Sequence, residues 1–580
     1  MQSTQRGRRW LSVRSALLAL LALLSVSLLR VALWAPRGLV GEAPRDGLSR
    51  VKGVVHVHTT LSDGGGTPEE VIAAARAAGL QFLVLTDHNN LDAKSFEGYH
   101  DGLLVIVGTE VSTGAGHVLG LGLPDPVFRF SGDAADALAD VRDLGGVAFA
   151  AHPMSPREDF RWTGWELPGP WGLELLNGDS QWRAAGWGRL LATAALYGVN
   201  RRYALLGSLT SPAATLARWD DLLRQRDVPG LAGTDAHSRV VLRKDWGVRF
   251  PSYEALFGLV QTHVVLEKPL AHDAAADARS IVEALGRGRS YIGLDALAPA
   301  DGFFFEAVAE GHRFGMGETL PATAGTRLRA GGALPSGARV TLRRDGRVVA
   351  EGVGGIEAPG AEAGTYRVDV RVPGWDVPWI LSNPIYVFHA GTAEERRRRA
   401  EWPAEPARPA PAVILDSFEG HTVFEPGADT LSEVARPALD ATGGLGGGGA
   451  AKLQFHLGVP TADHPHTFCA LVDWTKRDLS GRNGLTFAIR GDGVYRIWVQ
   501  VRDANPASAD QGTEWWFASV RTAPQWRHVA LPFARLRSIN KNTDGRLDLD
   551  KVQAIVFVID KGAEKPGSRG TLWIDDVGVY

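Results

Sequence analysis

Two histidines and an aspartate stand at the end of the first strongly apolar strand in the chain. Residues 54–57 are all valine except His56, which predicts a buried parallel strand. Side chains alternate along a strand, so His56 and His58 point to the same side, and Asp63 follows in the next turn. Imidazole nitrogens and a carboxylate oxygen suit a divalent transition-metal ion. An isolated His-x-His more often only caps a strand, so recurrence of such strand ends decides the interpretation.

Similar strand ends recur downstream. They are Thr86-Asp87-His88, Gly108-Thr109-Glu110, the Gly116-His117 strand start, Ala151-His152-Pro153 and Gly233-Thr234-Asp235-Ala236-His237. The stretch from His56 to His237 contains seven histidines, and only His100 lies outside such a position. Random placement would scatter histidines onto helices as well, so the pattern indicates one shared site.

The elements around these residues alternate between strand and helix from Lys52 to about Leu297, which predicts an α/β domain with a parallel sheet. Thr67-Pro68-Glu69-Glu70 supplies an N-cap, a proline at the first helical position and a capping-box glutamate. Apolar runs follow at 82–85, 103–107, 118–123, 147–150, 173–176 and 231–232. With the first strand they make about seven, near the number in a closed (β/α) barrel, whose functional groups lie at strand ends.

This order of motifs resembles the PHP family, the polymerase and histidinol phosphatase superfamily of metal-dependent phosphoesterases. The resemblance rests on His-x-His with Ser-Asp-Gly, then Thr-Asp-His, a glutamate after the third strand, Ala-His-Pro and Thr-Asp-Ala-His. It covers under half of the chain and implies a distorted (β/α)7 barrel with up to three divalent ions. The positions that match the family's metal ligands are His56, His58, Asp63, His88, Glu110, His117, His152, Asp235 and His237.

A mixed histidine and carboxylate site suits Zn, Mn or Fe, and a carboxylate such as Glu110 can bridge two ions. Two or three such ions would generate a hydroxide near neutral pH and neutralise phosphoester oxygens. We expect His56, His58, Glu110 and Asp235 to take part directly in catalysis. Asp87 either orients a neighbouring ligand and so supports catalysis, or makes turn hydrogen bonds after its strand.

Positively charged and polar side chains near these strands could contact the substrate. Arg157, Arg239 and Lys244 follow ligand-bearing strands and are candidates for binding the substrate phosphate, although a surface arginine is usually only solvated. Glu174 and Asn177 resemble the family's Glu-x-x-Asn and are expected to line the pocket without binding metal.

The sequence predicts a multidomain chain. Its expected parts are a signal peptide or signal anchor at 1–36, the PHP-like barrel at 51–298, an Ig-like β-sandwich at 301–390, a linker at 391–412 and a C-terminal β jelly roll at 413–580. Short alternating stretches between Gly/Pro turns predict the sandwich. Ser382-Asn383-Pro384-Ile385-Tyr386 resembles a closing strand that follows PHP domains, so we expect the sandwich to pack on the barrel. The run of Arg396 to Arg399 indicates a solvated linker.

The N-terminus indicates export. Four arginines before residue 15 precede an uncharged run rich in Leu and Ala from Ser15 to Leu29, a basic region followed by an apolar one. Val31 to Trp34 could extend the run if Arg30 reaches the membrane interface, and no clean cleavage site follows, which favours an uncleaved anchor. The remaining chain would lie outside the cytoplasm, membrane-anchored or periplasmic to extracellular. The single cysteine, Cys469, cannot form an intrachain disulfide and says nothing about location.

The last segment resembles galactose-binding-like jelly rolls of the carbohydrate-binding type. Its tryptophans are Trp474, Trp498, Trp515, Trp516, Trp526 and Trp573. Exposed tryptophans would stack on the sugars of a surface glycan, whereas most tryptophans in a β-sandwich belong to its core. Asp575 and Asp576 could contribute to a structural Ca²⁺ site.

Three functions compete. The first is an exported metal-dependent phosphoesterase (a hydrolase) acting on a phosphate mono- or diester. The second is a glycan-binding surface protein whose barrel metals are structural; the full ligand set argues against it, because structural sites are usually single and closed. The third is a nuclease. The net charge of -3 and the absence of a basic groove signature argue against a nucleic acid partner.

Overall fold

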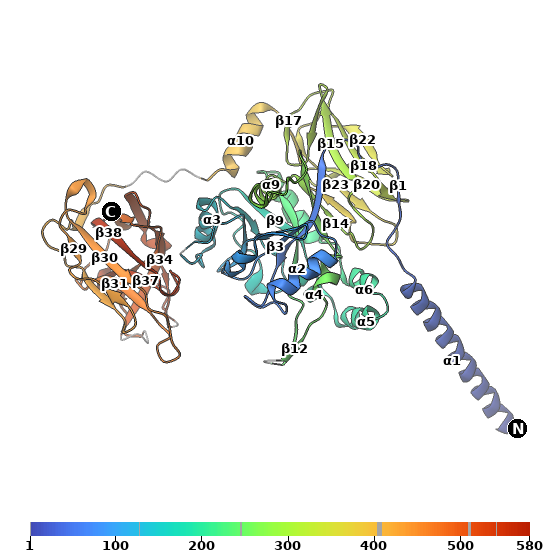
Figure 1. Ribbon diagram of the computed structural model, residues 1–580, viewed down its shortest axis with the longest axis horizontal. Coiled ribbons are helices and arrows are strands. Elements are labelled where there is room, and N and C mark those ends of the chain that lie inside the picture. The colour runs from blue at the N-terminus through green and yellow to red at the C-terminus, as the bar shows by residue number, and fades with distance from the viewer. Residues whose placement is uncertain (1, 127, 244–245, 403–408, 508–511, 541) are drawn as a thin grey trace. The chain divides into compact units, whose positions relative to one another are not determined.

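A computed structural model describes residues 2–126, 128–243, 246–402, 409–507, 512–540 and 542–580 (Figure 1). The chain divides into two compact units. The first contains residues 1–124 and 132–403, and the second contains residues 125–131 and 404–580. The predicted multidomain plan, with an α/β part and a C-terminal β-sandwich, is confirmed.

The first unit contains a closed ring of strands around a shared core. Its strands are β2 (Ser49–Val57), β3 (Phe82–Leu85), β5 (Leu103–Val107), β6 (Thr109–Thr113), β7 (Gly116–Leu121), β8 (Val147–Ala150), β9 (Trp171–Asn177) and β10 (Gly230–Ala236). Neighbours pair in parallel except β7, which runs antiparallel to β6 and β8. Only Gly108 separates β5 from β6. A Cβ there would lie 2.4 Å from the Gly120 carbonyl oxygen, so only glycine allows this close approach.

Most residues of the ring strands are buried, and several of the strands consist of apolar residues throughout, some of them β-branched. All four residues of β3 and all five of β5 are buried, as expected of strands covered on both sides. Helices α2 (Pro68–Ala77), α3 (Ala134–Asp143), α7 (Ala213–Leu223) and α9 (Ala274–Gly286) pack against ring strands. The predicted capping box of Thr67 and Glu70 is present at the start of α2. The ring therefore has a rigid core, and its strand ends are available for function.

Three helices follow β9 before α7: a short one and then two that pack together as a hairpin. They are α4 (Gly178–Ala184), α5 (Trp187–Tyr197) and α6 (Arg201–Ser208). Asn177 caps α4 by accepting a hydrogen bond from the Ser180 backbone, and Asn200 caps α6 in the same way through Tyr203. Further along, β11 (Val240–Arg243) and β12 (Trp246–Val248) form a two-stranded ribbon, and α8 (Tyr253–Phe257) follows.

The predicted middle sandwich shares a sheet with the ring. Its first sheet has the order β16-β15-β18-β22, from β15 (Phe303–Ala309), β16 (His312–Gly315), β18 (Arg327–Gly332) and β22 (Ile356–Pro359). Its second contains β17 (Thr319–Pro321), β20 (Arg339–Arg344), β21 (Arg347–Val353), β23 (Gly364–Arg371), β24 (Ile380–Ser382) and β25 (Ile385–Phe388). Strand β24 pairs with β14 (Ser290–Gly293), which pairs through β13 (Gln261–Leu266) with β2.

Asn383 holds this sheet to the ring. Its amide nitrogen donates to the carbonyl oxygens of Gly230 at 2.8 Å and Ser290 at 2.9 Å, and its amide oxygen accepts from the Gly230 backbone at 2.7 Å. The segment 382–386 therefore packs on the barrel.

The arginine run is not a solvated linker along its whole length. Ala390–Ala400 forms helix α10, and Arg396 is buried. Its guanidinium donates to Asp227 at 2.8 Å and lies 4.4 Å from the centre of the Phe388 ring. The sequence interpretation failed here because one of four consecutive arginines faces the protein, as helical periodicity dictates.

The N-terminal residues Gln2–Ala32 form helix α1, and every residue from Leu17 to Arg30 is exposed. Among the described residues, no helix has a stretch long and apolar enough to cross a membrane.

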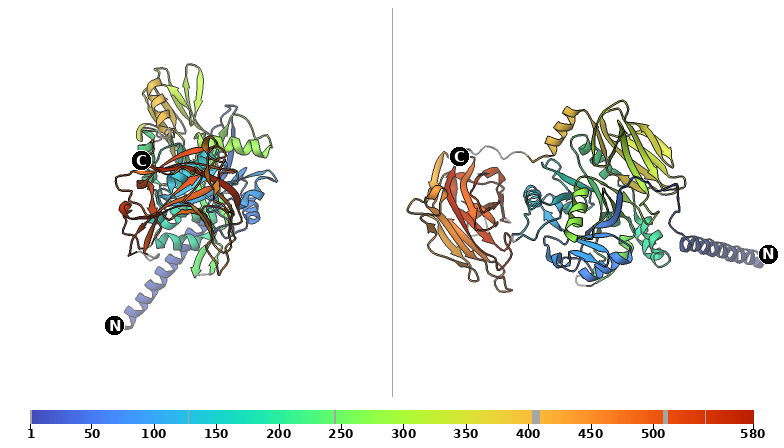
Figure 2. Two further views of the ribbon diagram at one scale, coloured as in Figure 1. Left: turned by 90° about the vertical axis from the view of Figure 1, so that its left-hand side faces the viewer. Right: turned by 45° about the horizontal axis from the view of Figure 1, so that its top comes forward.

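The second unit is a sandwich of two sheets. One has the order β28-β30-β38-β32-β35, with β26 and β29 at its side, and comprises β26 (Val413–Asp416), β28 (Glu433–Val434), β29 (Leu439–Asp440), β30 (Ala450–His456), β32 (Gly484–Gly491), β35 (Arg527–Pro532) and β38 (Arg569–Val579). The other has the order β27-β31-β37-β33-β34-β36 and comprises β27 (Glu425–Ala428), β31 (Phe468–Asp473), β33 (Arg496–Ala504), β34 (Thr513–Arg521), β36 (Arg537–Ser538) and β37 (Val552–Asp560). Figure 2 shows both sheets in the orange and red part of the chain. Their inner faces form one core that includes Trp516 and Cys469.

Candidate metal centre

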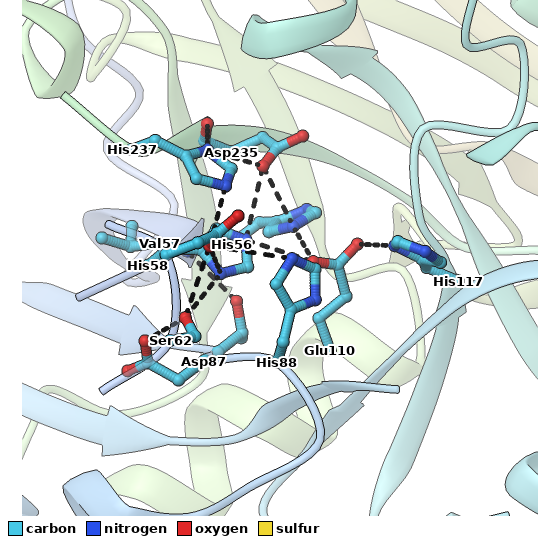
Figure 3. A network of polar contacts seen from close by, with 12 residues as sticks. His56, Val57, His58, Ser62, Asp87, His88, Glu110, His117, Asp235 and His237 are labelled. Atoms are coloured by element: carbon cyan, nitrogen blue, oxygen red, sulfur yellow. Dashed lines mark hydrogen bonds and ion pairs between the residues drawn. The ribbon is translucent and has the colours of Figure 1, made fainter. Parts of the chain in front are cut away.

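One carboxylate oxygen lies at the centre of the candidate site. Oε2 of Glu110 on β6 is 3.1 Å from Nε2 of both His56 and His58, and 3.2 Å from Nδ1 of His88 (Figure 3). Among the described residues, none of these four atoms has a hydrogen-bond partner, and all four are buried. Polar atoms buried without partners are costly, and a bound cation would satisfy all four at once. The donor set therefore fits a divalent metal ion.

Asp235 completes this donor group from β10, the strand next to β2. It is the penultimate residue of β10, and its Oδ1 lies 3.4 Å from Nε2 of both His56 and His58. Strand β10 pairs in parallel with β2, so the ends of the two strands meet at one edge of the ring. The ligand atoms of His56, His58, Glu110 and Asp235 lie within 4.8 Å of one another.

Two further donor groups adjoin the first. The ligand atoms of His58, Asp63, His88 and His237 form one, and those of His88, Glu110 and His117 form another. In the former, Oδ1 of Asp63 is 3.2 Å from Nε2 of His237. Each of the residues His58, His88 and Glu110 belongs to two of the three groups, so neighbouring ions bound there would share ligands. The arrangement accommodates two or three ions.

His152 approaches the centre from β8. Its Nε2 lies 2.8 Å from Oε1 of Glu110, and Nδ1 of His117 lies at the same distance from the same oxygen. The structure therefore brings all nine predicted ligands together, with the histidines grouped around the carboxylates of Glu110, Asp63 and Asp235. His100, the histidine outside the pattern, instead lies 2.8 Å from the Phe96 carbonyl oxygen through its Nε2.

Three of the ligand positions have a left-handed backbone. The φ angles are 67° at His56, 30° at His152 and 49° at Asp235. Residues other than glycine adopt such angles at a cost of about 1–3 kcal/mol each, and they do so mainly where function requires a particular side-chain direction. Each of the three stands at or just after the end of a ring strand. The backbone turn there aims the side chain at the centre of the site.

Glu174 on β9 orients two of the histidines. Its Oε1 lies 2.6 Å from Nδ1 of His56, and its Oε2 accepts a hydrogen bond from the His152 backbone at 2.6 Å. The amide of Asn177 donates to Glu174 at 2.9 Å and to Asp235 at 3.2 Å. A carboxylate on one ring nitrogen leaves the other free for a metal, so Glu174 sets the His56 tautomer. Neither residue belongs to one of the three donor groups, and neither lines the pocket at these groups that the sequence led us to expect them to line.

Asp87 supports the loop after β2 and does not reach the reacting centre. Its carboxylate accepts from the Thr59 backbone at 2.8 Å, from the Thr59 hydroxyl at 2.8 Å and from the Ser62 hydroxyl at 2.5 Å. The Ser62 hydroxyl also lies 3.5 Å from Nδ1 of His58. Both predicted roles of Asp87 therefore stay open, because it makes turn hydrogen bonds to Thr59 and also contacts Ser62, which lies beside the ligand position His58.

Tyr253 on α8 joins two ligand loops, and the sequence did not indicate this. Its hydroxyl lies 2.8 Å from the His58 carbonyl oxygen and 2.9 Å from that of His237. Burial raises the pKa of Tyr253 to about 12, so the phenol stays protonated and can donate.

The charges in the site oppose the effect of burial. Burial alone would raise the pKa of the Glu110 carboxyl, but the charge of His56 and hydrogen bonds from His117 and His152 hold it well below its ordinary value. Burial would lower the pKa of His152, yet the hydrogen bond and charge of Glu110 raise it to about 9. Metal ions would therefore compete with protons for these side chains.

A pocket of about 250 Å³ opens above the donor groups. Arg157 and Arg239, both predicted to contact phosphate, line it, and the Arg157 guanidinium lies 3.7 Å from the centre of the Phe160 ring. Lys244 lies outside the described residues. Asp179 and Arg183 on α4 also line the pocket and form an ion pair, and the sequence analysis missed both. Their position just after the Glu-x-x-Asn strand end was the available signal.

In the second unit, Asp575 makes only backbone contacts in the described chain: one carboxylate oxygen accepts from Leu445 at 2.7 Å and the other from Asp576 at 2.7 Å. Burial and the charges of Asp576 and Glu419 raise the pKa of Asp575. The tryptophans divide between core and surface, with Trp516 buried and Trp474 57% exposed.

Comparison with known proteins agrees with part of this geometry. Residues 55–127 match the model of the PHP domain, which confirms the PHP resemblance over the segment that carries His56 to His117. Comparison with curated proteins gives no match.

Solved structures show weaker similarity. A two-domain protein from Bacteroides vulgatus, described as containing a predicted PHP-like metal-dependent phosphoesterase, is 16% identical, with a TM-score of 0.28 over 60% of this chain and 99% of its own. The family 11 carbohydrate-binding module of a Clostridium thermocellum cellulosomal cellulase is 18% identical, with a TM-score of 0.23 over 29% of this chain and 92% of its own. A family 30 module from the same organism is 19% identical, with a TM-score of 0.23 over 29% of this chain and 97% of its own. Similarities of this size establish no function for this chain.

Proposed function

We propose that this protein is an exported, metal-dependent phosphoesterase that hydrolyses a phosphate mono- or diester. The observation that carries the proposal is the set of four buried, unpartnered atoms of His56, His58, His88 and Glu110 that face one point. Hydrolysis of a phosphoester requires an activated water and neutralisation of the phosphoryl oxygens. When bound, two or three Zn, Mn or Fe ions would supply both.

The protein's own residues have distinct roles in this proposal. His56, His58, Glu110 and Asp235 hold the ions, and Glu174 keeps His56 in the tautomer that binds. The remaining donor groups extend the site toward the pocket. Arg157, Arg183 and Arg239 line the pocket and supply positive charge for the phosphate group. Shared ligands favour a catalytic centre over a structural one, because structural sites are usually single and closed.

We propose that the N-terminal segment 1–36, part of which lies outside the residues whose side chains the structure describes, anchors the enzyme in a membrane, with both units on the outer side. Leu17 to Leu29 is uncharged, and its leucines are about half exposed, so the described protein does not cover them. Arginines precede this run and acidic residues do not, which favours retention of the N-terminus in the cytoplasm.

A second candidate function, binding of a surface glycan, concerns the second unit. Trp474 is exposed beside Arg502, whose guanidinium lies 5.8 Å from the Trp474 ring and 3.8 Å from the Trp515 ring. Flat aromatic faces next to a donor-rich side chain suit sugar rings. In this alternative, metal ions bound by the barrel would have a structural role only. A Ca²⁺ ion near Asp575 and Asp576 would be a further structural element of this unit.

The test is metal analysis of the purified full chain, coupled to hydrolysis of p-nitrophenyl phosphate and bis-p-nitrophenyl phosphate. We expect two or three transition-metal ions per chain and hydrolysis of one of the two esters. His56→Ala and Asp235→Ala should lose both metal and activity. His100→Ala is the matched control, because His100 lies outside the site and should leave both unchanged.

Absence of metal after reconstitution, with no hydrolysis, would overturn the phosphoesterase. Full metal content with no hydrolysis of either ester, together with binding of oligosaccharides lost in Trp474→Ala, would favour the glycan-binding protein instead.

A further inference from the structure

Helix α5 presents an almost wholly apolar surface to solvent. Its exposed residues are Trp187, Gly188, Arg189, Leu191, Ala192, Ala194 and Ala195. Trp187 is 82% exposed and Leu191 66% exposed, and Val199 follows just after the helix at 41%. Only Thr193 is fully buried, and its hydroxyl donates to the Ala204 carbonyl oxygen on α6. Apolar side chains spaced three and four residues apart on an outward face indicate a binding surface.

The α5–α6 hairpin is attached to the end of helix α1. The amide nitrogen of Asn200, between the two helices, donates to the carbonyl oxygens of Val31 at 3.1 Å and Trp34 at 2.8 Å. The Trp34 ring packs edge-on against Tyr203, with ring centres 5.6 Å apart. Figure 1 shows α5 and α6 beside the point where α1 leaves the first unit. The apolar surface of α5 therefore lies next to the C-terminal end of α1, where Leu33, the residue after the helix, is 74% exposed.

Exposed arginines lie on α5 itself, on α6 and in the last turn of α1. Arg30, Arg189 and Arg202 are exposed, and among the described residues none of them has an acidic partner. The neighbouring Arg201 pairs with Glu254. An apolar face with unpaired arginines on and near it is typical of helices that lie in the interface of an anionic bilayer.

We propose that α5 is an interfacial helix, which binds the surface of the lipid bilayer that α1 enters. The occupant of the apolar face is lipid, because the surface lies next to the end of α1 and has exposed arginines on and near it. Trp187 and Leu191 insert at the boundary of headgroups and acyl chains, and Arg189 and Arg202 meet lipid phosphates. Helix α5 is about 16 Å long at 1.5 Å per residue, so it gives the barrel a second attachment and a defined orientation.

This orientation concerns the active site directly. Arg183 of the pocket precedes Trp187 by four residues, with only Ala185 and Gly186 between the two helices. The rim of the pocket is therefore tied to the lipid-binding helix. The inference relies on the proposed membrane location of α1 but not on hydrolysis.

The experiment labels the full chain in lipid vesicles with an environment-sensitive nitrobenzoxadiazole dye. Ala195→Cys places the dye on the exposed face of α5, and Glu283→Cys places it on α9 as the matched control. The native Cys469 is buried and its pKa is raised to about 12 by burial, so it does not react. The vesicles contain phosphatidylcholine and phosphatidylglycerol, with or without brominated acyl chains.

We expect emission from position 195 to shift to shorter wavelength in vesicles and to be lost with brominated lipid, whereas position 283 shows neither effect. Trp187→Glu combined with Leu191→Glu should abolish the quenching at position 195 while vesicle association through α1 and the metal content persist.

Vesicle association without quenching at position 195 would overturn the inference and leave the anchor intact. Failure of the full chain to associate with vesicles would overturn both the anchor and the inference. A blue shift that rises with protein density and resists brominated lipid would identify a second copy of the chain as the occupant, and this outcome also overturns the inference.

Discussion

Oε1 of Glu174 lies 2.6 Å from Nδ1 of His56, and both side chains are completely buried. The contact crosses the ring from β9 to β2 and leaves Nε2 of His56 facing Glu110 and Asp235. Burial disfavours a charged imidazole, but the charges of Glu174, Asp235 and Glu110 raise the pKa of His56 well above its ordinary value. The contact thus determines which nitrogen of His56 is available to a metal.

Glu174→Gln tests this contact. The amide has the shape of the carboxylate but can present its NH₂ group to His56, so the preferred tautomer is lost. We expect metal affinity or activity to fall roughly 10- to 100-fold, as for other residues that orient a metal ligand. Metal titration and steady-state kinetics measure the effect. Glu283→Gln on α9 is the exposed control, and equal behaviour of the two variants would contradict the role of Glu174.

Glu110→Gln should have a larger effect than Glu174→Gln, because Glu110 belongs to two of the three donor groups and both its oxygens face histidines. We expect loss of at least one ion per chain. Activity should fall by more than the roughly 10- to 100-fold decrease expected for Glu174→Gln. Metal content by mass spectrometry and turnover of the same esters provide the measurement. Retention of all ions would show that Glu110 is not a shared ligand.

Asp87→Ala removes the acceptor for three donors from Thr59 and Ser62. Leaving a buried donor without a partner costs about 1–3 kcal/mol, so the free energy of unfolding of the first unit should fall by at least that amount. Denaturant unfolding monitored in the first unit gives the value. Asp92→Ala, at an exposed aspartate five residues later, should change it little.

Removal of metal should loosen the ligand loops of the first unit and leave the second unit unchanged. Ligands that bind only the folded state stabilise it by mass action, and the donor groups all belong to the first unit. Hydrogen–deuterium exchange after chelation should therefore increase in segments 58–63 and 235–238. Strands β37 and β38 serve as the internal control. Equal exchange with and without metal would indicate that the site does not bind it.

Glu564 gives the second unit a pH dependence. Burial disfavours the carboxylate and raises its pKa from 4.5 to about 8. Between these values the folded state holds a proton that the unfolded state has released, so stability falls as pH rises from 4.5 to 8 and then levels off. Glu564→Gln should remove this slope and be more stable than the parent chain above pH 8.

Exchange rates of β37 and β38 across this range measure the effect of Glu564. Glu433→Gln, at an exposed glutamate of the same unit, is the control and should keep the parent slope. A slope that persists in Glu564→Gln would assign it to another group.

The sequence predicted the candidate site better than the surroundings of the site. His56 and Asp235 stand at the ends of buried strands and Glu110 follows the buried strand β5, and parallel strands bring their ends to one edge of the ring, so local pattern sufficed. Strand β7 is antiparallel because a short turn joins it to β6. Its apolar sequence is like that of a parallel strand, so the pattern alone did not show its direction. The sequence does not distinguish Arg183 from other helical arginines. Only tertiary packing shows that α4 faces the pocket. Arg396 was misassigned for the same reason.

The left-handed backbone at His56, His152 and Asp235 affects how long the protein would persist in a cell. Left-handed angles at non-glycine residues store strain in the folded chain, and ligand binding at these positions would help to offset it. The chain without metal is then the form that opens more often, and opened chains are what proteases degrade. Metal supply would therefore control how much of the protein accumulates as well as how active it is. Glycine at these three positions would relieve the strain, but it would also remove the side chains that bind the metal.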